Sequence, residues 1–307
     1  MKAEQWSLVN HKNHRNWAEN PGLLLLASGI LIGLTFPLAK LAGQAQIPAA
    51  SWIMLGSLGA SITLLPLLLF NGNFSWPRGQ QLRYVLVAGP LTFAGPNLIV
   101  FLVVPEVGAG YSGIMFALSP VCTVTLARLF GMGSLGKLRN IGIALGFSGA
   151  IGISFSHNSS SASPSIFWLL LAMAIPLVLA AGNIYRSLDW PKNASPELLA
   201  FWSHAVAFLV YFVITMMSEN GTPWAVIQTV PSLVIAKLFL AALTAPIVFR
   251  LQRFGGPVTL SQIGYVAAAT GLLVSTVFLG ERYPVTSWLS LLVIASGIAI
   301  TLFANKR

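Results

Sequence analysis

The sequence predicts an all-α integral membrane protein with ten transmembrane helices arranged as two inverted five-helix repeats. Three observations support this prediction. Of the 307 residues, 56% are hydrophobic and only 8% are charged, ten apolar runs have about the length that crosses a bilayer, and the two halves resemble each other. Soluble domains carry about 25% charged residues, so seven acidic and seventeen basic residues are too few to cover a soluble protein of this size.

Ten mostly apolar runs are predicted to cross the membrane as helices, each needing roughly 20 residues. In order, they are residues 22–41, 48–70, 84–104, 107–130, 138–155, 165–186, 197–217, 232–250, 257–279 and 286–303. Helix is the favoured state because hydrocarbon offers no water to satisfy free backbone groups. Helix starts are predicted where a polar cap precedes proline, at Asn20-Pro21, Ser163-Pro164 and Ser195-Pro196. In the third run, Gly89-Pro90 and Gly95-Pro96 predict a break or kink.

The distribution of Lys and Arg predicts that both ends of the chain are cytoplasmic. With the N-terminus inside, all basic residues except Lys40, Lys237 and Arg282 fall on the cytoplasmic side, as the positive-inside rule requires. Residues 1–21 and 304–307 are then cytoplasmic tails of a multi-pass plasma (inner) membrane protein. The lipid bilayer is its expected partner, and no obligate protein partner, cofactor or metal is expected. Basic residues spread between apolar runs argue against nucleic acid as a partner.

The two halves of the chain align with each other at nearly constant offsets. Ser112, Ile114 and Gly131 meet Ser261, Ile263 and Gly280, and Lys40 meets Arg186. The polar linker 156–164 separates a first repeat, residues 22–155, from a second, residues 165–303. Because each repeat holds an odd number of spans, the second repeat enters the membrane from the opposite face. Inverted repeats around a central site are typical of transporters that expose the site alternately to each side.

Glycine-rich motifs recur at matching places in both halves. They are Gly33-Leu34-Thr35-Phe36-Pro37-Leu38-Ala39-Lys40, Gly110-Tyr111-Ser112-Gly113, Gly255-Gly256-Pro257-Val258-Thr259 and Val277-Phe278-Leu279-Gly280-Glu281. These motifs resemble those of the EamA family in the drug/metabolite transporter superfamily, over about residues 22–303. The resemblance implies ten helices in two inverted repeats around a central cavity, and transport of small metabolites or drugs.

Polar side chains within the predicted spans are the candidate substrate contacts, because such groups are costly to keep in hydrocarbon. His204 lies roughly 12 Å along the seventh span. The family resemblance implies that Lys40 faces the mouth of the cavity, whereas Arg186 is interpreted as a positive-inside anchor. Each of these groups has a structural alternative as an ordinary contact between helices. The predicted substrate-binding residues are Lys40, Asn97, Tyr111, Ser112, Met115, Ser119, Asn183, Tyr185, His204, Gln262 and Tyr265.

The expected function is secondary transport, without ATP, of a small-molecule substrate by an exporter or exchanger of amino-acid-like or other small organic solutes. The cationic Lys40 and Lys237, together with His204, favour an anionic or zwitterionic solute. A channel-like facilitator and a membrane-embedded enzyme stay open as alternatives. The sequence lacks the His-Glu-x-x-His motif of zinc proteases and the paired intramembrane acids of aspartyl proteases, so no catalytic residues are expected.

Overall fold

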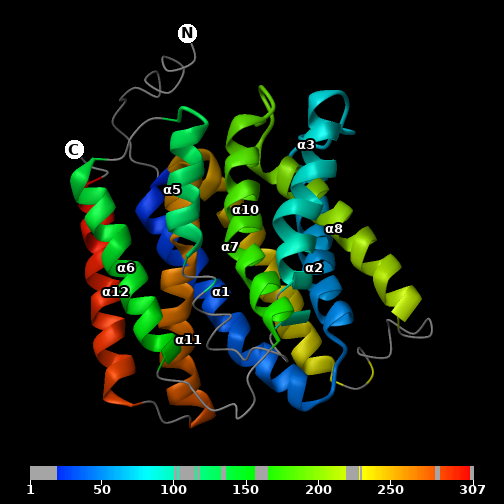
Figure 1. Ribbon diagram of the computed structural model, residues 1–307. Helices are drawn as coiled ribbons and strands as arrows, with labels where there is room; N and C mark the ends of the chain where they lie inside the picture. Colours follow the sequence, from blue (N-terminus) through cyan, green and yellow to red (C-terminus); the bar gives the residue numbers. More distant parts are fainter. Residues whose placement is uncertain are drawn as a thin grey trace.

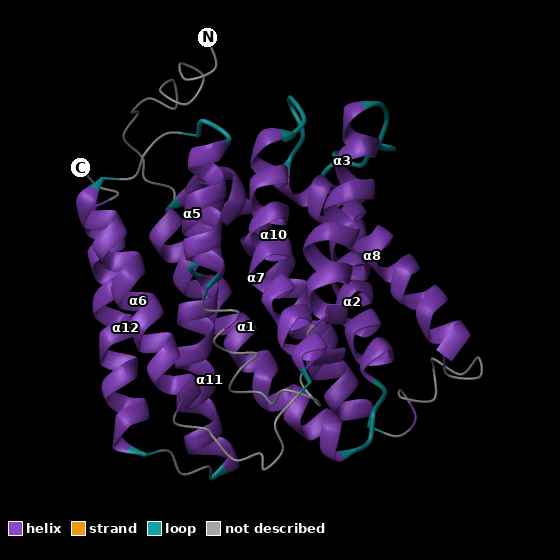
Figure 2. Ribbon diagram, in the orientation of Figure 1, coloured by secondary structure: helices purple, strands orange, loops and turns teal. Residues whose placement is uncertain are grey.

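The computed structural model describes residues 19–99, 102–103, 115, 118–132, 136–155, 165–218, 228, 230–280 and 284–304. All regular secondary structure in these residues is helical (Figures 1 and 2). The elements are α1 (Pro21–Gln44), α2 (Ala49–Phe70), α3 (Gln80–Ala88), the π-helix η3 (Gly89–Ala94), α5 (Ser119–Leu129), α6 (Lys137–Phe155), α7 (Ile166–Leu188), α8 (Pro196–Ser218), α10 (Pro231–Ser261), α11 (Ile263–Leu279) and α12 (Val285–Ala304).

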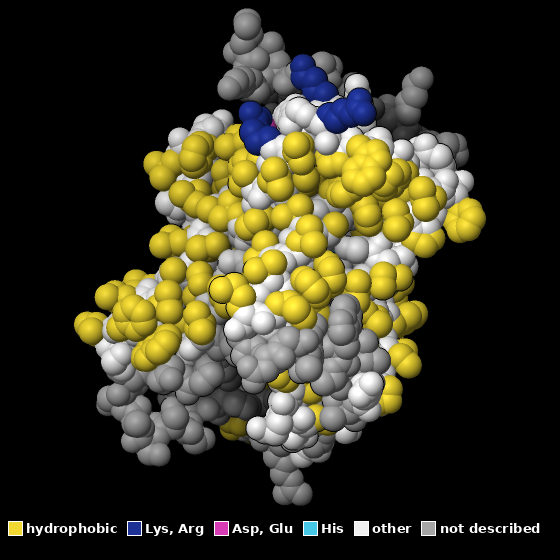
Figure 3. All heavy atoms as spheres, turned by 90° about the vertical axis from the view of Figure 1, so that its right-hand side faces the viewer, with side chains coloured by type: hydrophobic (Ala, Val, Ile, Leu, Met, Phe, Trp, Pro, Cys, Tyr) yellow, Lys and Arg dark blue, Asp and Glu magenta, His cyan; other side chains and the backbone are white. Residues whose placement is uncertain are grey.

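Within the described ranges, 6 helices are long and apolar enough to cross a membrane, namely α1, α2, α7, α8, α10 and α12. Their outer surfaces are apolar: Phe70 in α2 is 89% exposed and Met217 in α8 is 84% exposed. Figure 3 shows apolar side chains over the middle of one face, with Lys and Arg side chains gathered at its upper end. Soluble proteins rarely expose so large an apolar surface. The chain is therefore an all-helical, multi-pass membrane protein, as the composition predicts.

Two of the predicted helix starts are confirmed with their caps. The side chain of Asn20 accepts a hydrogen bond from the Gly22 amide at 3.0 Å, and α1 begins at Pro21. The hydroxyl of Ser195 accepts from the Leu198 amide at 3.1 Å, and α8 begins at Pro196. Such bonds satisfy amides that have no partner inside the helix. The third predicted start, at residues 163–164, lies outside the described residues.

The predicted break in the third run is present as a change of helix type. The α-helical turns of α3 end at Ala88 and continue as the π-helix η3. Proline removes a backbone donor and disturbs the α-helical ladder, and π-turns often mark functional positions. The hydroxyl of Tyr211 in α8 donates to the carbonyls of Phe93 and Ala94 at 3.1 and 2.9 Å. The neighbouring helix thus satisfies carbonyls of the interrupted segment.

The break between the eighth and ninth predicted spans lies where the sequence predicts it. α10 extends to Ser261, with one break in its helical geometry at Gly256, where φ is 71° and ψ is 179°. Only glycine adopts this conformation readily, and the next residue, Pro257, starts a further helical turn. Gln262, between α10 and α11, keeps helical backbone angles, with φ -74° and ψ -6°, so the break lies at Gly256 and helical geometry resumes at Pro257, where the sequence predicts the ninth span.

Helices from the two halves of the chain pack directly against each other. α6 packs on α12, α1 on α11 and α10, and α2 on α8 and α10. Glycines allow close approach at these contacts: a Cβ atom on Gly142 would lie 2.7 Å from the Gly297 carbonyl oxygen, and one on Gly59 would lie 2.7 Å from the Leu238 carbonyl oxygen. Small residues let backbones approach in this way where lipid surrounds the helices.

Candidate functional site

Arg186, in the last turn of α7, is buried in the interior of the helix bundle. Its side chain is only 1% exposed, and it is one of the largest fully buried side chains among the described residues. The interpretation of Arg186 as an anchor at the membrane surface is therefore wrong. The sequence shows that Arg186 lies near the end of a span, but not which way its side chain faces. In the structure, α7 packs against α10 and η3.

Aromatic rings surround the guanidinium of Arg186. Its central carbon lies 5.2 Å from the ring centroid of Phe249 in α10 and 5.9 Å from that of Phe93 in η3. The imidazole ring of His204 in α8 lies 4.2 Å from the Phe93 ring. A cation over an aromatic face is stabilised by the ring quadrupole, especially when water is excluded. Four helical elements thus converge on one buried cation.

Several polar atoms around this cation are buried without a hydrogen-bond partner among the described residues. They are Nε and Nη1 of Arg186, Nδ1 of His204 and the hydroxyl of Tyr84 in α3. Nη2 of Arg186 makes one long contact, 3.5 Å, with Oδ1 of Asn183. Arg186 also interacts electrostatically with Tyr84 and His204. We define the Arg186 cluster as Tyr84, Phe93, Asn183, Arg186, His204 and Phe249.

A second polar group lies at the end of α7, beside the Arg186 cluster. Arg83 of α3 forms a two-pronged ion pair with Asp189, whose second oxygen lies 3.1 Å from Nε of Arg83. Tyr185 donates to the same carboxylate at 2.7 Å, and Gln80 at 3.3 Å. We call Gln80, Arg83, Tyr185 and Asp189 the Asp189 bridge. It joins the start of α3 in the first half to the end of α7 in the second.

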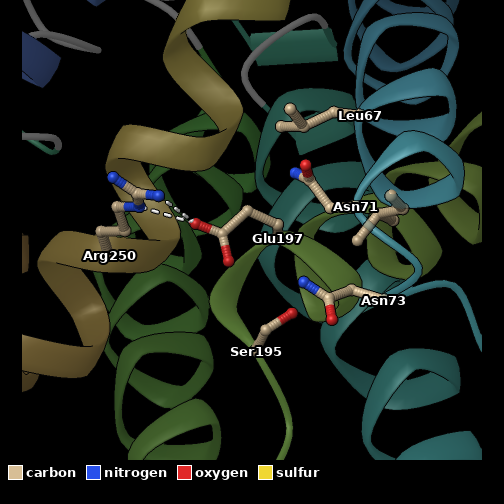
Figure 4. A pocket seen from close by; sticks show the side chains of 7 residues that line it. Leu67, Asn71, Asn73, Ser195, Glu197 and Arg250 are labelled. Atoms are coloured by element: carbon tan, nitrogen blue, oxygen red, sulfur yellow. Dashed lines mark hydrogen bonds and ion pairs between the residues drawn. The ribbon is translucent and has the colours of Figure 1, made fainter.

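A small pocket of about 190 Å³ opens between α2, α8 and α10 (Figure 4). Arg250 points across it to Glu197, with 2.6 Å between Nη2 and Oε1. Pockets that enclose small-molecule ligands usually measure about 300–1,000 Å³, so this one is too small to enclose a typical solute. Its lining residues are Leu67, Leu68, Asn71, Asn73, Ser195, Glu197 and Arg250. None of them belongs to the set predicted from the sequence.

The first half of the chain matches a known transporter family. Residues 21–155 match the model of the EamA-like transporter family. The match supports the motif resemblance over the first half of the chain, and its bounds are close to those of the first predicted repeat, residues 22–155.

Similarity to proteins of known sequence and structure extends over most of the chain. The uncharacterized inner membrane transporter YedA of Escherichia coli strain K12 is 24% identical over 277 residues, which cover 90% of this chain and 88% of YedA. YedA of Escherichia coli O157:H7 aligns to the same extent. A solved crystal structure with 17% sequence identity covers 95% of this chain and 99% of its own, with a TM-score of 0.69. At that identity the match shows that the two chains share a fold.

Some of the predicted substrate-binding residues lie in or beside the Arg186 cluster. Asn183 and His204 belong to the cluster, and Tyr185 belongs to the adjoining Asp189 bridge. Asn97 donates to the carbonyl of Phe93 at 2.7 Å, one turn away along the interrupted third helix. Lys40 lies in the last turns of α1, but its side chain is outside the description.

The remaining predicted residues lie away from the Arg186 cluster or outside the description. Met115 packs with Val103 and residues of α7, and Ser119 is buried at the start of α5. Gln262 and Tyr265 lie where α10 meets α11, and the Tyr265 hydroxyl donates to the carbonyl of Ile143 at 3.3 Å. Tyr111 and Ser112 lie outside the described residues. Substrate binding by these residues stays a prediction.

Replacing Asp189 with asparagine is expected to remove an acid-sensitive part of the stability. Partial burial would raise the pKa of the Asp189 carboxyl, but hydrogen bonds from Arg83, Tyr185 and Gln80 outweigh burial and hold the pKa below its ordinary value. A depressed pKa stabilises the fold above the unfolded pKa, about 3.9, and this contribution is lost as pH falls through the folded pKa.

The melting temperature of purified protein, measured between neutral and acidic pH, tests this expectation. The difference between wild type and Asp189→Asn should be largest at neutral pH and should shrink on acidification. It should be modest, because Arg83 is largely exposed and water screens the pair. Glu19→Gln, which neutralises an exposed carboxylate before α1, is the matched control. If the difference in melting temperature grew as the pH fell, the result would contradict a lowered pKa for Asp189.

Proposed function

We propose that this EamA-like protein is a secondary transporter that moves small organic solutes by alternating access between two inverted repeats, residues 22–155 and 165–303. The observation that carries the proposal is the Arg186 cluster, a buried polar group built jointly by both halves. Tyr84 and Phe93 come from the first half, and Asn183, Arg186, His204 and Phe249 from the second. Polar residues inside a membrane bundle typically mark solute pathways.

The pattern of helix contacts supports an internal two-fold relation. Under such a relation, each predicted span corresponds to the span five places later, so that α1 is exchanged with α7 and α5 with α11. The contact of α1 with α11 is then mirrored by that of α7 with α5. Likewise, α2 with α10 is mirrored by α8 with α3 and η3, and α6 packs on its own counterpart α12. Contacts that occur in exchanged pairs are what inverted repeats produce.

Polar contacts between the halves concentrate at one end of the described bundle. The Asp189 bridge joins α3 to α7, Arg139 of α6 donates to the Thr259 hydroxyl at 2.8 Å, and Trp202 of α8 donates to the carbonyl of Ser75 at 3.0 Å. The beginning of α3 and the end of α12 both lie at this upper end in Figure 1. This end is predicted to be cytoplasmic. The contacts would close the solute path there, and the path would open when the two halves separate.

The solute is proposed to be amino-acid-like or a similar small organic molecule, moved outward or in exchange. Positive charge in the bundle supports an anionic or zwitterionic solute: Arg186 is buried, and the ammonium of Lys237 lies 5.2 Å from the Trp52 ring centroid. The relative YedA is named an inner membrane transporter, which supports the plasma (inner) membrane as the location, with both termini cytoplasmic. No described group of three or more His, Cys, Asp or Glu residues could hold a metal.

Counterflow in proteoliposomes tests the proposal. Vesicles that contain the purified protein are loaded with an unlabelled solute, and uptake of the same labelled solute is followed for each member of an amino-acid and organic-acid panel. A carrier should show saturable uptake that is stimulated by solute on the opposite side. Flux without saturation or stimulation, together with single-channel currents, would instead favour the channel-like alternative. If a topology reporter fused to the C-terminus showed that this end lies outside the cell, the result would contradict the inverted repeats.

A further inference from the structure

The guanidinium of Arg186 is buried without a counter-charge in the described part of the chain. The ion pairs recorded there use other cations: Asp189 pairs with Arg83, and Glu197 pairs with Arg250. A buried charge without a partner is strongly unfavourable, and truncating one member of a buried pair usually destabilises for this reason. The site therefore has the character of one half of an ion pair.

The unused donors around Arg186 are suited to a planar anion. A guanidinium presents its N–H groups in a flat fork that matches a carboxylate with two parallel hydrogen bonds. Nε and Nη1 are buried without partners among the described residues, as are the Tyr84 hydroxyl and Nδ1 of His204. The rings of Phe93 and Phe249 lie close to the guanidinium and can pack on a flat ligand.

We propose that Arg186 binds the carboxylate of the transported solute, with Tyr84 and His204 as accessory hydrogen-bonding groups. This inference rests on the proposed transport function and narrows its substrate class to carboxylates. With Arg186 only 1% exposed, the solute reaches it when the first half, which supplies Tyr84 and Phe93, separates from the second. The carboxylate then replaces the aromatic and helical packing as the partner of the cation.

Ligand-dependent melting of the purified, full-length protein tests the proposal. The probes are the proteinogenic L-amino acids and a set of mono- and dicarboxylates, each paired with its neutral amide. At least one carboxylate should raise the melting temperature of the wild type while its amide does not, because a ligand that binds the folded state stabilises it by mass action. No preference for any carboxylate over its amide in the wild type would overturn the proposal.

Variants at Arg186 separate binding from structure. Arg186→Met should weaken the apparent affinity for the stabilising carboxylate at least tenfold. Arg253→Met is the matched control, because Arg253 is exposed and also lies over an aromatic ring, 5.4 Å from the Trp190 centroid. It should change the affinity less than twofold. An Arg186→Met protein that keeps the carboxylate preference would overturn the proposal.

Two further readouts keep the test decisive if a variant folds poorly. Without ligand, Arg186→Met should melt at or above the wild-type temperature, since it removes an unpaired buried charge; a lower temperature would indicate a structural role and count against binding. Arg186→Lys keeps the charge but loses the planar fork, so it should bind the carboxylate more weakly than the wild type. Unchanged affinity in Arg186→Lys would overturn the two-pronged contact.

Failure of this inference can be told apart from failure of the transport function. If wild-type vesicles exchange amides as well as carboxylates, the protein is a transporter and the carboxylate site is wrong. If no solute is exchanged but a carboxylate stabilises the protein through Arg186, the site stands and the transport function is wrong.

Discussion

Replacing Gly297 with valine is expected to disrupt the seam between α6 and α12 and to leave little correctly folded protein. A Cβ atom at this position would lie 2.6 Å from both the Gly142 carbonyl oxygen and the Gly146 amide nitrogen. These are backbone atoms, so no side-chain rotation can relieve the overlap, and the helices must separate. Overpacking typically costs about 1–3 kcal/mol and occasionally more, and we expect the upper end here. Melting temperature and monodispersity in detergent measure the effect.

Gly264→Ala is the matched control for this prediction. Gly264 lies in α11, and a Cβ atom there would have no other atom within 4 Å. Alanine also favours helix over glycine by about 1 kcal/mol, so this variant should be as stable as the wild type or slightly more stable. Equal melting temperatures for Gly297→Val and the wild type would show that α6 and α12 are not packed as described.

The helices themselves could be predicted from the sequence, because their signals are local. Length and apolarity of each run are enough to indicate a span in hydrocarbon. Cap chemistry fixed the starts at Pro21 and Pro196, where an oxygen side chain precedes proline. The interruption at Gly89 was likewise readable from proline chemistry, although its π-helical form depends on the surrounding helices.

The candidate site could be predicted only in part, because sequence position gives depth along a helix but not the face that is buried. Polarity within spans predicts His204 and Asn183 as candidates, and both lie in the Arg186 cluster. Arg186 was misinterpreted, since the end of a span is where surface anchors also occur. Its acidic neighbour three residues later, Asp189, pairs with Arg83 of a distant helix, and this pairing leaves Arg186 without a nearby carboxylate among the described residues.

The break between the eighth and ninth predicted spans, in contrast, could be predicted from local chemistry. The sequence places a glycine–proline step at Gly256-Pro257, and this step predicts the start of a new helix. In the structure the helical geometry breaks at Gly256, whose φ is 71°, whereas Gln262 keeps helical backbone angles. A glycine with positive φ followed by proline is a local signal, so this interruption can be placed without knowledge of the neighbouring helices.

Replacing Tyr211 with phenylalanine is expected to destabilise the protein and to impair solute exchange. The Tyr211 hydroxyl reaches the carbonyls of Phe93 and Ala94 in η3. Without the hydroxyl, the buried carbonyls of Phe93 and Ala94 lose a hydrogen-bond donor, and an unsatisfied buried acceptor costs about 1–3 kcal/mol. Phe93 lies against both His204 and Arg186, so a loosened η3 also disturbs the proposed carboxylate site. Melting temperature and counterflow rate report the two effects.

Thr215→Val is the matched control for Tyr211→Phe. Thr215 lies one turn farther along α8, is fully buried, and its hydroxyl has no hydrogen-bond partner among the described residues. Removing an unbonded buried hydroxyl should leave stability unchanged or slightly raised, because no partner is left unsatisfied. Tyr211 therefore acts through its two bonds only if Tyr211→Phe lowers both melting temperature and exchange while Thr215→Val lowers neither. Identical behaviour of the two variants would show that η3 keeps its form, and Phe93 its place beside Arg186, without Tyr211.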